Sequence, residues 1–216
     1  MFLDIHTHKT KKGQGVLSIQ SLSLNENTFL AMPKMKPISI GIHPWYGKLE
    51  ELDKNMKYLN VLARQENVKL IGECGLDKLK GETMESQLQM LEAQISLAEE
   101  LQKPIILHCV KAFDELIALK KRLQPKVPMI IHGINKKQEM VQQLANQGFY
   151  LSFGDAVLKS REVALALEKI EVPFFLETDE ADIEIKEIYN KVAEIKKITL
   201  DELKDVIFAN WKKIGL

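Results

Sequence analysis

Short apolar runs alternate along the chain with longer stretches in which apolar residues recur every three to four positions. The short runs are typical of strands, and the longer stretches are typical of amphipathic helices. Strands are predicted near residues 2–6, 16–22, 37–42, 69–73, 104–108, 128–132, 149–153 and 173–177. Helices are predicted near residues 50–66, 84–101, 111–122, 136–147, 160–169, 182–196 and 200–213.

Eight strands interleaved with helices predict an α/β fold, a parallel TIM-type (β/α) barrel. The chain has 216 residues, whereas such a barrel typically needs about 250. Residues 9–15 and 25–36 are mostly loop-like, and no helix is predicted between the first two strands. We therefore expect one domain over residues 1–216, with a barrel that is trimmed or distorted between its first and third strands.

Charge and composition narrow the class of protein. Thirty basic residues balance thirty acidic ones, so net charge gives no sign of a nucleic-acid partner. The apolar runs are too short to span a membrane, and the N-terminus lacks a secretory signal pattern. Strand alternation predicts that Cys74 and Cys109 are small buried thiols on the helix side of the sheet. A cytoplasmic protein with no membrane partner is expected.

Residues of metal-ligand type gather at the ends of the predicted strands. Each of the five histidines, together with one glutamate and one aspartate, ends or directly follows such a strand: His6, His8, His43, His108, His132, Glu73 and Asp179. One such histidine is more often structural, but histidine and carboxylates are also the common metal ligands. Because strand ends meet at one mouth of a barrel, their joint occurrence predicts a metallohydrolase site.

The motifs around these residues occur in a recognisable order between residues 2 and 179. They are Asp4-Ile5-His6-Thr7-His8, Gly41-Ile42-His43-Pro44, Gly72-Glu73-Cys74-Gly75-Leu76-Asp77, Lys103-Pro104-Ile105-Ile106-Leu107-His108-Cys109, Ile131-His132-Gly133 and Leu176-Glu177-Thr178-Asp179. In this the chain resembles the TatD-type metal-dependent deoxyribonucleases, a family within the amidohydrolase-like barrel hydrolases. It departs from the family in Cys74, in a shortened segment between the first and third strands and in the lack of an Arg-containing loop after Asp179.

The resemblance implies a site for two divalent metal ions. His6, His8 and Asp179 would hold one ion, His108 and His132 would hold the other, and Glu73 would bridge them. Two ions about 3.5–4 Å apart can share a hydroxide and neutralise charge on a phosphoryl group. The ligand types leave the metal open among zinc, manganese, magnesium, nickel, iron and cobalt.

Further roles are expected around this site. Asp179 is the candidate for orienting the water and accepting its proton. The resemblance places His43 against the substrate's phosphate or leaving group, although a structural role beside Pro44 is the alternative. Asp4 and Glu177 share strand parity with ligands and are candidates for orienting them or for hydrogen bonds near the barrel floor.

Two weaker features concern the substrate. Cationic residues follow several strand ends, as an anionic substrate requires, although lysine is abundant throughout the chain. They are Lys9, Lys11, Lys12, Lys78, Lys80, Lys111, Lys136, Lys137, Lys159 and Arg161. Trp45 and Tyr46 are candidates for stacking an unpaired base, with packing under the rim as the alternative.

The function expected from these features is a metal-dependent phosphodiesterase, an exonuclease on the ends of single-stranded DNA. The alternative is hydrolysis of an ester or amide, in a small molecule or an aminoacyl-tRNA. A non-catalytic metal-binding scaffold is a more remote alternative, because no predicted ligand is missing. The physiological substrate, cleavage polarity and oligomeric state are left open by the sequence.

Overall fold

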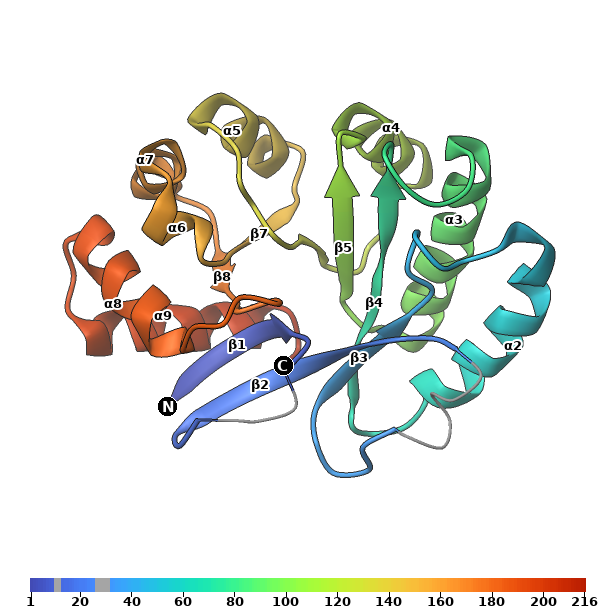
Figure 1. Cartoon of the computed structure of the whole chain (residues 1–216), viewed down its shortest axis with the longest axis horizontal. Helices are drawn as coiled ribbons and strands as arrows, with labels where there is room; N and C mark the ends of the chain where they lie inside the picture. The colour runs from blue at the N-terminus through green and yellow to red at the C-terminus, as the bar shows by residue number, and fades with distance from the viewer. Residues whose placement is uncertain (10–12, 26–31) are drawn as a thin grey trace. The chain divides into compact units, whose positions relative to one another are not determined.

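The structure is a computed structural model that describes residues 1–9, 13–25 and 32–216 (Figure 1). It divides into two compact units, which are described separately. The first unit comprises residues 1–20 and 130–216, and the second comprises residues 21–129. The prediction of one domain over residues 1–216 stays a prediction.

The first unit contains the beginning and the end of the chain's strand series. Its strands are β1 (Phe2–Thr7), the first part of β2 (Val16–Ser23), β6 (Met129–Ile131), β7 (Tyr150–Phe153) and β8 (Phe174–Leu176). β1 pairs in parallel with β2, and β7 pairs in parallel with both β6 and β8. Thr7 forms a parallel bridge with Asp179, directly after β8. The last strand therefore lies beside the first, as closure of a barrel requires.

Five helices belong to the described residues of the first unit. They are α5 (Gln138–Asn146), α6 (Ala156–Lys159), α7 (Arg161–Lys169), α8 (Ile185–Lys196) and α9 (Leu200–Lys213). Of these, α5, α8 and α9 pack against its strands. The Tyr189 hydroxyl of α8 accepts from the Leu3 amide and donates to the Leu3 carbonyl, at 3.0 Å each. Asn210 of α9 donates to the Phe174 carbonyl at 2.9 Å. These side chains fix α8 to β1 and α9 to β8.

The second unit continues the alternation of strands and helices. Its elements are β3 (Ile38–Gly41), η1 (Leu49–Glu51), α2 (Leu52–Ala63), β4 (Val68–Asp77), α3 (Met84–Leu101), β5 (Ile105–Val110) and α4 (Phe113–Leu123). β4 pairs in parallel with β3 and with β5, and Figure 1 shows β4 and β5 running side by side. The β4–β5 register shifts between Ile71 and Cys74.

Two glycines flank Glu73 at this register shift. Gly72 and Gly75 have φ values of +110° and +147°, which side chains rarely permit. A Cβ on Gly75 would lie 1.9 Å from the His108 carbonyl oxygen, and one on Gly72 would lie 2.3 Å from the Ile106 oxygen. Glycine is therefore required here for β4 to approach β5.

All eight predicted strands are present, and β4 and β5 run past the predicted ends at residues 73 and 108. The prediction that Glu73 and His108 end their strands is wrong, because Cys74–Asp77 continue to pair with Leu107–Val110. The predicted helices are all present: α3 and α9 have the predicted bounds, α4 begins and ends slightly later than predicted, and the others are shorter. The first of them begins as the 3-10 turn η1. The short helix α6 is not predicted by the sequence pattern.

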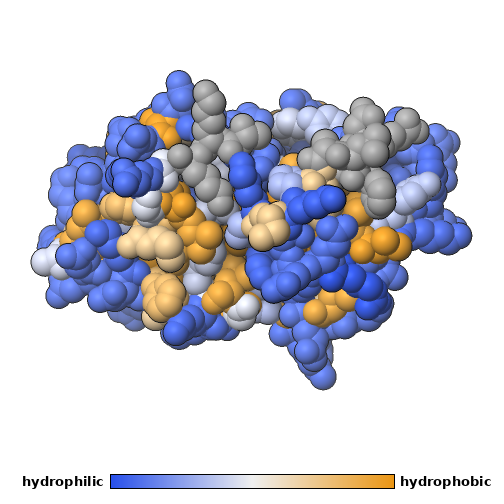
Figure 2. Space-filling view, turned by 90° about the horizontal axis from the view of Figure 1, so that it is seen from below, coloured by the Kyte–Doolittle hydropathy of each residue, from blue (hydrophilic) through white to orange (hydrophobic). Residues whose placement is uncertain are grey.

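The prediction of two buried thiols is confirmed for Cys74, which is fully buried, and is wrong for Cys109, which is half-buried. Figure 2 shows a face that is mostly hydrophilic, with small hydrophobic areas between. Among the helices of the described residues, none has the length and apolar character that a membrane span needs. The loop expected over residues 9–15 and 25–36 lies partly outside the described residues, as do Lys11 and Lys12.

Candidate metal centre

His6, His8 and Asp179 come together in the first unit. Asp179 Oδ1 lies 3.6 Å from His6 Nε2 and 3.5 Å from His8 Nε2. The three potential ligand atoms lie within 4.8 Å of one another. His6 is fully buried, whereas the side chains of His8 and Asp179 are about one-third exposed. Two imidazoles and one carboxylate that converge from one side suit a divalent transition-metal ion or zinc.

Backbone pairing to β1 sets the position of Asp179. The Asp179 amide donates to the His6 carbonyl at 3.0 Å, and the His8 amide donates to the Asp179 carbonyl at 3.1 Å. Asp179 has a φ of +50°, a conformation that aspartate and asparagine tolerate better than most residues. These backbone bonds hold the short Asp179 side chain beside both histidines.

Asp4 fastens the segment before Asp179 to the same strand. The Thr178 amide donates to Asp4 Oδ1 at 3.1 Å, and the Thr178 hydroxyl donates to Asp4 Oδ2 at 2.7 Å. Burial, with a smaller contribution from the charge of Glu177, raises the pKa of Asp4 to about 7 despite these hydrogen bonds. Asp4 thus orients the residues that carry Asp179, in keeping with the supporting role expected for it.

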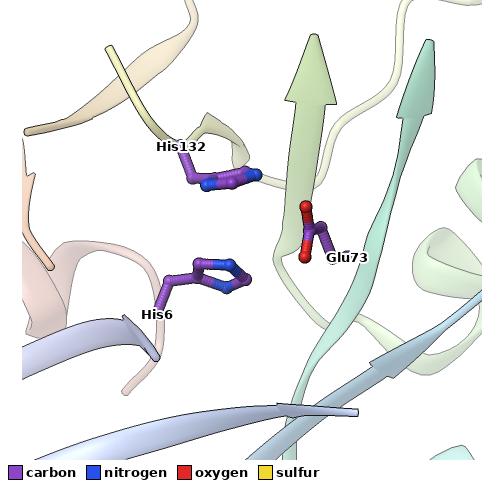
Figure 3. Close-up of side chains that lie close together, drawn as sticks. All are labelled: His6, Glu73 and His132. Carbon is purple, nitrogen blue, oxygen red and sulfur yellow. The ribbon is translucent and has the colours of Figure 1, made fainter. Parts of the chain in front are cut away.

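His132 lies in the same unit, on the segment that follows β6. Its ring centroid is 4.2 Å from that of His6, and Figure 3 shows the two imidazoles facing each other. Its Nδ1 lies 3.6 Å from Glu177 Oε1, which also accepts from the Gly133 amide at 2.6 Å. His132, Glu177 and Asp179 form a second group whose ligand atoms lie within 4.8 Å. Glu177 is fully buried.

Glu73, His43 and His108 come together in the second unit. Glu73 projects from β4 (Figure 3) and is almost fully buried. Its Oε1 lies 3.0 Å from His43 Nε2 and 3.2 Å from His108 Nδ1. Their potential ligand atoms also lie within 4.8 Å of one another. The sequence places His43 outside the ion cage, whereas the structure places it directly on the carboxylate expected to bridge the ions.

Asp77 supports this cluster and was given no role by the sequence. Its Oδ2 accepts the indole N–H of Trp45 at 2.6 Å and lies 3.1 Å from His108 Nε2. Although burial raises it, hydrogen bonds from Trp45, His108 and the Leu79 amide together hold the pKa of Asp77 below its ordinary value. Asp77 could have been predicted from the sequence, because it follows Glu73 by four residues and residues at this spacing lie on the same face of a strand.

Two buried glutamines of α3 fix the strand ends that carry these residues. Gln94 accepts from the Ile42 amide at 2.7 Å and donates to the Ile42 carbonyl at 3.1 Å. Gln87 makes the same pair of bonds to Asp77, at 2.7 and 2.9 Å. Each amide side chain satisfies one residue's backbone donor and acceptor, as buried polar groups require. α3 thereby positions the residues next to His43 and Asp77 itself.

The family model described as TatD related DNase matches residues 4–214. An uncharacterized metal-dependent hydrolase of Methanocaldococcus jannaschii is 26% identical over 82% of this chain and 74% of its own length. A 3'-5' ssDNA/RNA exonuclease of Citrobacter koseri is 31% identical over 56% of this chain. That match spans only 47% of the exonuclease, about half its length.

Solved structures show the fold. A TatD homolog from Escherichia coli K12 has a TM-score of 0.79 and 20% identity, over 99% of this chain and 97% of its own. A TatD family hydrolase from Entamoeba histolytica has a TM-score of 0.79 and 19% identity, over 99% of this chain and 97% of its own. With the eight strands of the described residues, these likenesses confirm the predicted (β/α) barrel.

Proposed function

Since the chain belongs to the TatD related DNase family of metal-dependent hydrolases, we propose that it hydrolyses phosphodiester bonds at the ends of single-stranded DNA. The observation that carries this proposal is the convergence of His6, His8 and Asp179, held in place by backbone pairing. Such a cluster suits a cation that acts on an anionic ester. The name of the exonuclease relative supports the choice of substrate.

Two divalent ions are proposed for the site. His6, His8 and Asp179 would hold the first, His108 and His132 would hold the second, and Glu73 would be shared between them. The donor types fit this assignment, because each group combines imidazole nitrogen with carboxylate oxygen. When bound, the ions supply positive charge for the phosphoryl group and lower the pKa of water.

The chain's own residues do the remaining work. Asp179 is the proposed acceptor for the proton of the attacking water, since its backbone is hydrogen-bonded to His6 and His8 and its carboxylate is partly open to solvent. Asp4 orients Thr178, the residue before Asp179, and Glu177 orients Gly133, the residue after His132. Fixed ligands of this kind act without reorganising as charge develops.

The surface beside His43 supports a single-stranded substrate. Tyr46 is 65% exposed, and its ring centroid lies 5.4 Å from that of His43. Trp45 lies beneath Lys80, whose Nζ is 3.8 Å from the indole centroid. The exposed ring of Tyr46 is suited to stack an unpaired base, and Lys80 on the neighbouring Trp45 is suited to attract the adjoining phosphate. Several other predicted cations are instead paired with carboxylates, among them Lys78 with Glu115 and Lys137 with Glu162.

The proposal is tested with purified protein and end-labelled single-stranded DNA. Magnesium, manganese and zinc are added in turn, with a chelator in a parallel reaction. We expect metal-dependent shortening from one end, which also gives the polarity. A carboxylic ester and an aminoacyl-tRNA are offered under the same metals. Turnover of either without DNA cleavage would contradict the phosphodiesterase proposal and favour the alternative, an ester or amide hydrolase.

Replacing Tyr46 with alanine is expected to raise the KM for single-stranded DNA roughly 5–150-fold, because stacking on one aromatic ring contributes about 1–3 kcal/mol. Phenylalanine at the same position should restore most of the affinity. Tyr58→Ala is the matched control, since Tyr58 is 54% exposed on α2 of the same unit. Equal KM values for the two alanine variants would rule out a stacking role for Tyr46.

A further inference from the structure

Two histidines of the second unit face the same carboxylate oxygen with different ring atoms. His43 presents Nε2 to Glu73 Oε1, and His108 presents Nδ1 to it. A neutral imidazole has one N–H, which donates, and one bare nitrogen, which accepts or binds a metal. The position of the proton on each ring therefore decides which histidine is a ligand. The far nitrogen of each ring settles that position.

On His43 the far nitrogen is an acceptor. The backbone N–H of Trp45 donates to His43 Nδ1 at 3.1 Å. Because a backbone amide can only donate, Nδ1 is bare and the single proton of the neutral ring is on Nε2. The N–H at Nε2 then donates to Glu73 Oε1, so this atom has no lone pair for a metal ion.

On His108 the far nitrogen is a donor. Its Nε2 lies 3.1 Å from Asp77 Oδ2, an oxygen that already accepts from the Trp45 indole. The other Asp77 oxygen accepts from the Leu79 amide at 2.7 Å. An ionised carboxylate only accepts hydrogen bonds, and Asp77 already accepts two. It therefore accepts from His108 as well, and the His108 proton is on Nε2. The bare Nδ1 then points at Glu73 Oε1, 3.2 Å away.

Two acceptor atoms that face each other at this distance repel, and positive charge between them turns the repulsion into attraction. The arrangement is also firmly held. Gln87 bonds both backbone groups of Asp77, and the side chain of Asp77 is 2% exposed. A carboxylate behind an imidazole is the usual device that fixes the ring of a metal-binding histidine.

We propose that Asp77 is a positioning residue that keeps the His108 proton on Nε2 and so makes Nδ1 the metal-binding atom, while His43 donates from Nε2 to Glu73 and binds no metal. Both rings have the Nε2–H tautomer, but His43 turns its Nε2 toward Glu73 and His108 turns its Nδ1 toward Glu73. The inference rests on the proposed function for the metal role of His108. For His43 it replaces the contact with the substrate's phosphate or leaving group that the family resemblance implies.

The first test is the tautomer itself, measured on protein labelled with 15N-histidine. The metal-free protein is examined by two-bond 1H–15N correlation at about pH 8, above the usual imidazole pKa. Each of the five histidines is assigned with its His→Gln variant. We expect the Nε2–H form for both His108 and His43. An Nδ1–H form of either ring in the wild-type protein would overturn the proposal, whatever the behaviour of any variant.

The second test removes the acceptor. In Asp77→Leu the remaining carboxylate partner of His108 in this cluster is Glu73, so the proton is expected to move to Nδ1. The affinity for manganese, measured by titration without substrate, should fall about 10–100-fold. Asp77→Asn keeps an oxygen for the Trp45 and His108 donors and should restore the Nε2–H form. Wild-type affinity and tautomer in Asp77→Leu would contradict a positioning role.

Matched histidine variants test the other half of the proposal. His43→Gln keeps an N–H donor for Glu73 and should retain manganese binding, whereas His108→Gln should lose it. Equal losses in the two variants would show that His43 is a ligand. Neither the tautomer nor the manganese titration involves DNA, so this inference and the nuclease proposal can fail independently. Trp45→Phe serves as the control, since it removes the other donor to Asp77 Oδ2 and should leave the His108 tautomer unchanged.

Discussion

Replacing Glu73 with alanine is expected to abolish metal-dependent hydrolysis while the protein keeps its fold. Glu73 is almost fully buried, and one of its oxygens lies within 3.2 Å of nitrogens from two histidines. Its loss removes the proposed shared ligand and leaves His43 and His108 without the carboxylate they face. Since one preorganised electrostatic group contributes about 10²–10³ in rate, and this one would serve two ions, we expect a fall of at least about 10³-fold.

Glu73→Gln separates charge from shape at this position. Glutamine fills the same space and can accept from His43, but it lacks the negative charge that a shared ligand needs. It should therefore be nearly as inactive as alanine, with weaker binding of every proposed ion. Glu66→Gln, an exposed residue of the same unit, makes the same chemical change and should be silent. Retained hydrolysis in Glu73→Gln, at unchanged manganese stoichiometry, would exclude the shared-ligand role.

Asp179→Asn is expected to lower the hydrolysis rate by roughly 10²–10⁴-fold, the range typical of a lost general base. Asparagine tolerates the positive φ of this position and keeps both backbone bonds to β1, so the fold should be unaffected. What changes is the oxygen 3.5–3.6 Å from the two histidines, which loses its charge. The rate, the unfolding midpoint and the bound manganese per chain measure these effects separately.

The two variants should differ in metal content. Asp179→Asn should weaken only the ion proposed for His6 and His8, whereas Glu73→Gln should weaken both ions. Asp182→Asn is the control for the first, because Asp182 is an exposed acid three residues further along, paired at 3.8 Å with Lys9. Hydrolysis at the wild-type rate in Asp179→Asn would remove this residue from the mechanism, even if the metal cluster itself were present.

Much of the fold was predictable because periodicity reports directly on strands and helices. The eight strands lie where short apolar runs occur, and α3 and α9 begin and end at the predicted residues. Threonines cap both helices: Thr83 accepts from the Ser86 amide, and Thr199 forms a capping box with Glu202. The length of β4 was not predictable, because the residues after Glu73 pair with β5 across a register shift that depends on two glycines.

The sequence by itself determined which residues of ligand type lie on the strands or soon after them, and their motifs identified the family. His6, His8 and Asp179 could be grouped before their distances were known. Only the tertiary structure decided that His43 faces Glu73, that Asp77 stands behind His108 and which nitrogen of each ring is turned inward. Strand alternation fixes the face of the sheet on which a side chain lies. The orientation of an imidazole and the position of its proton depend also on its partners, and Glu73 and Asp77 lie 30 and 31 residues away from His43 and His108 in the chain.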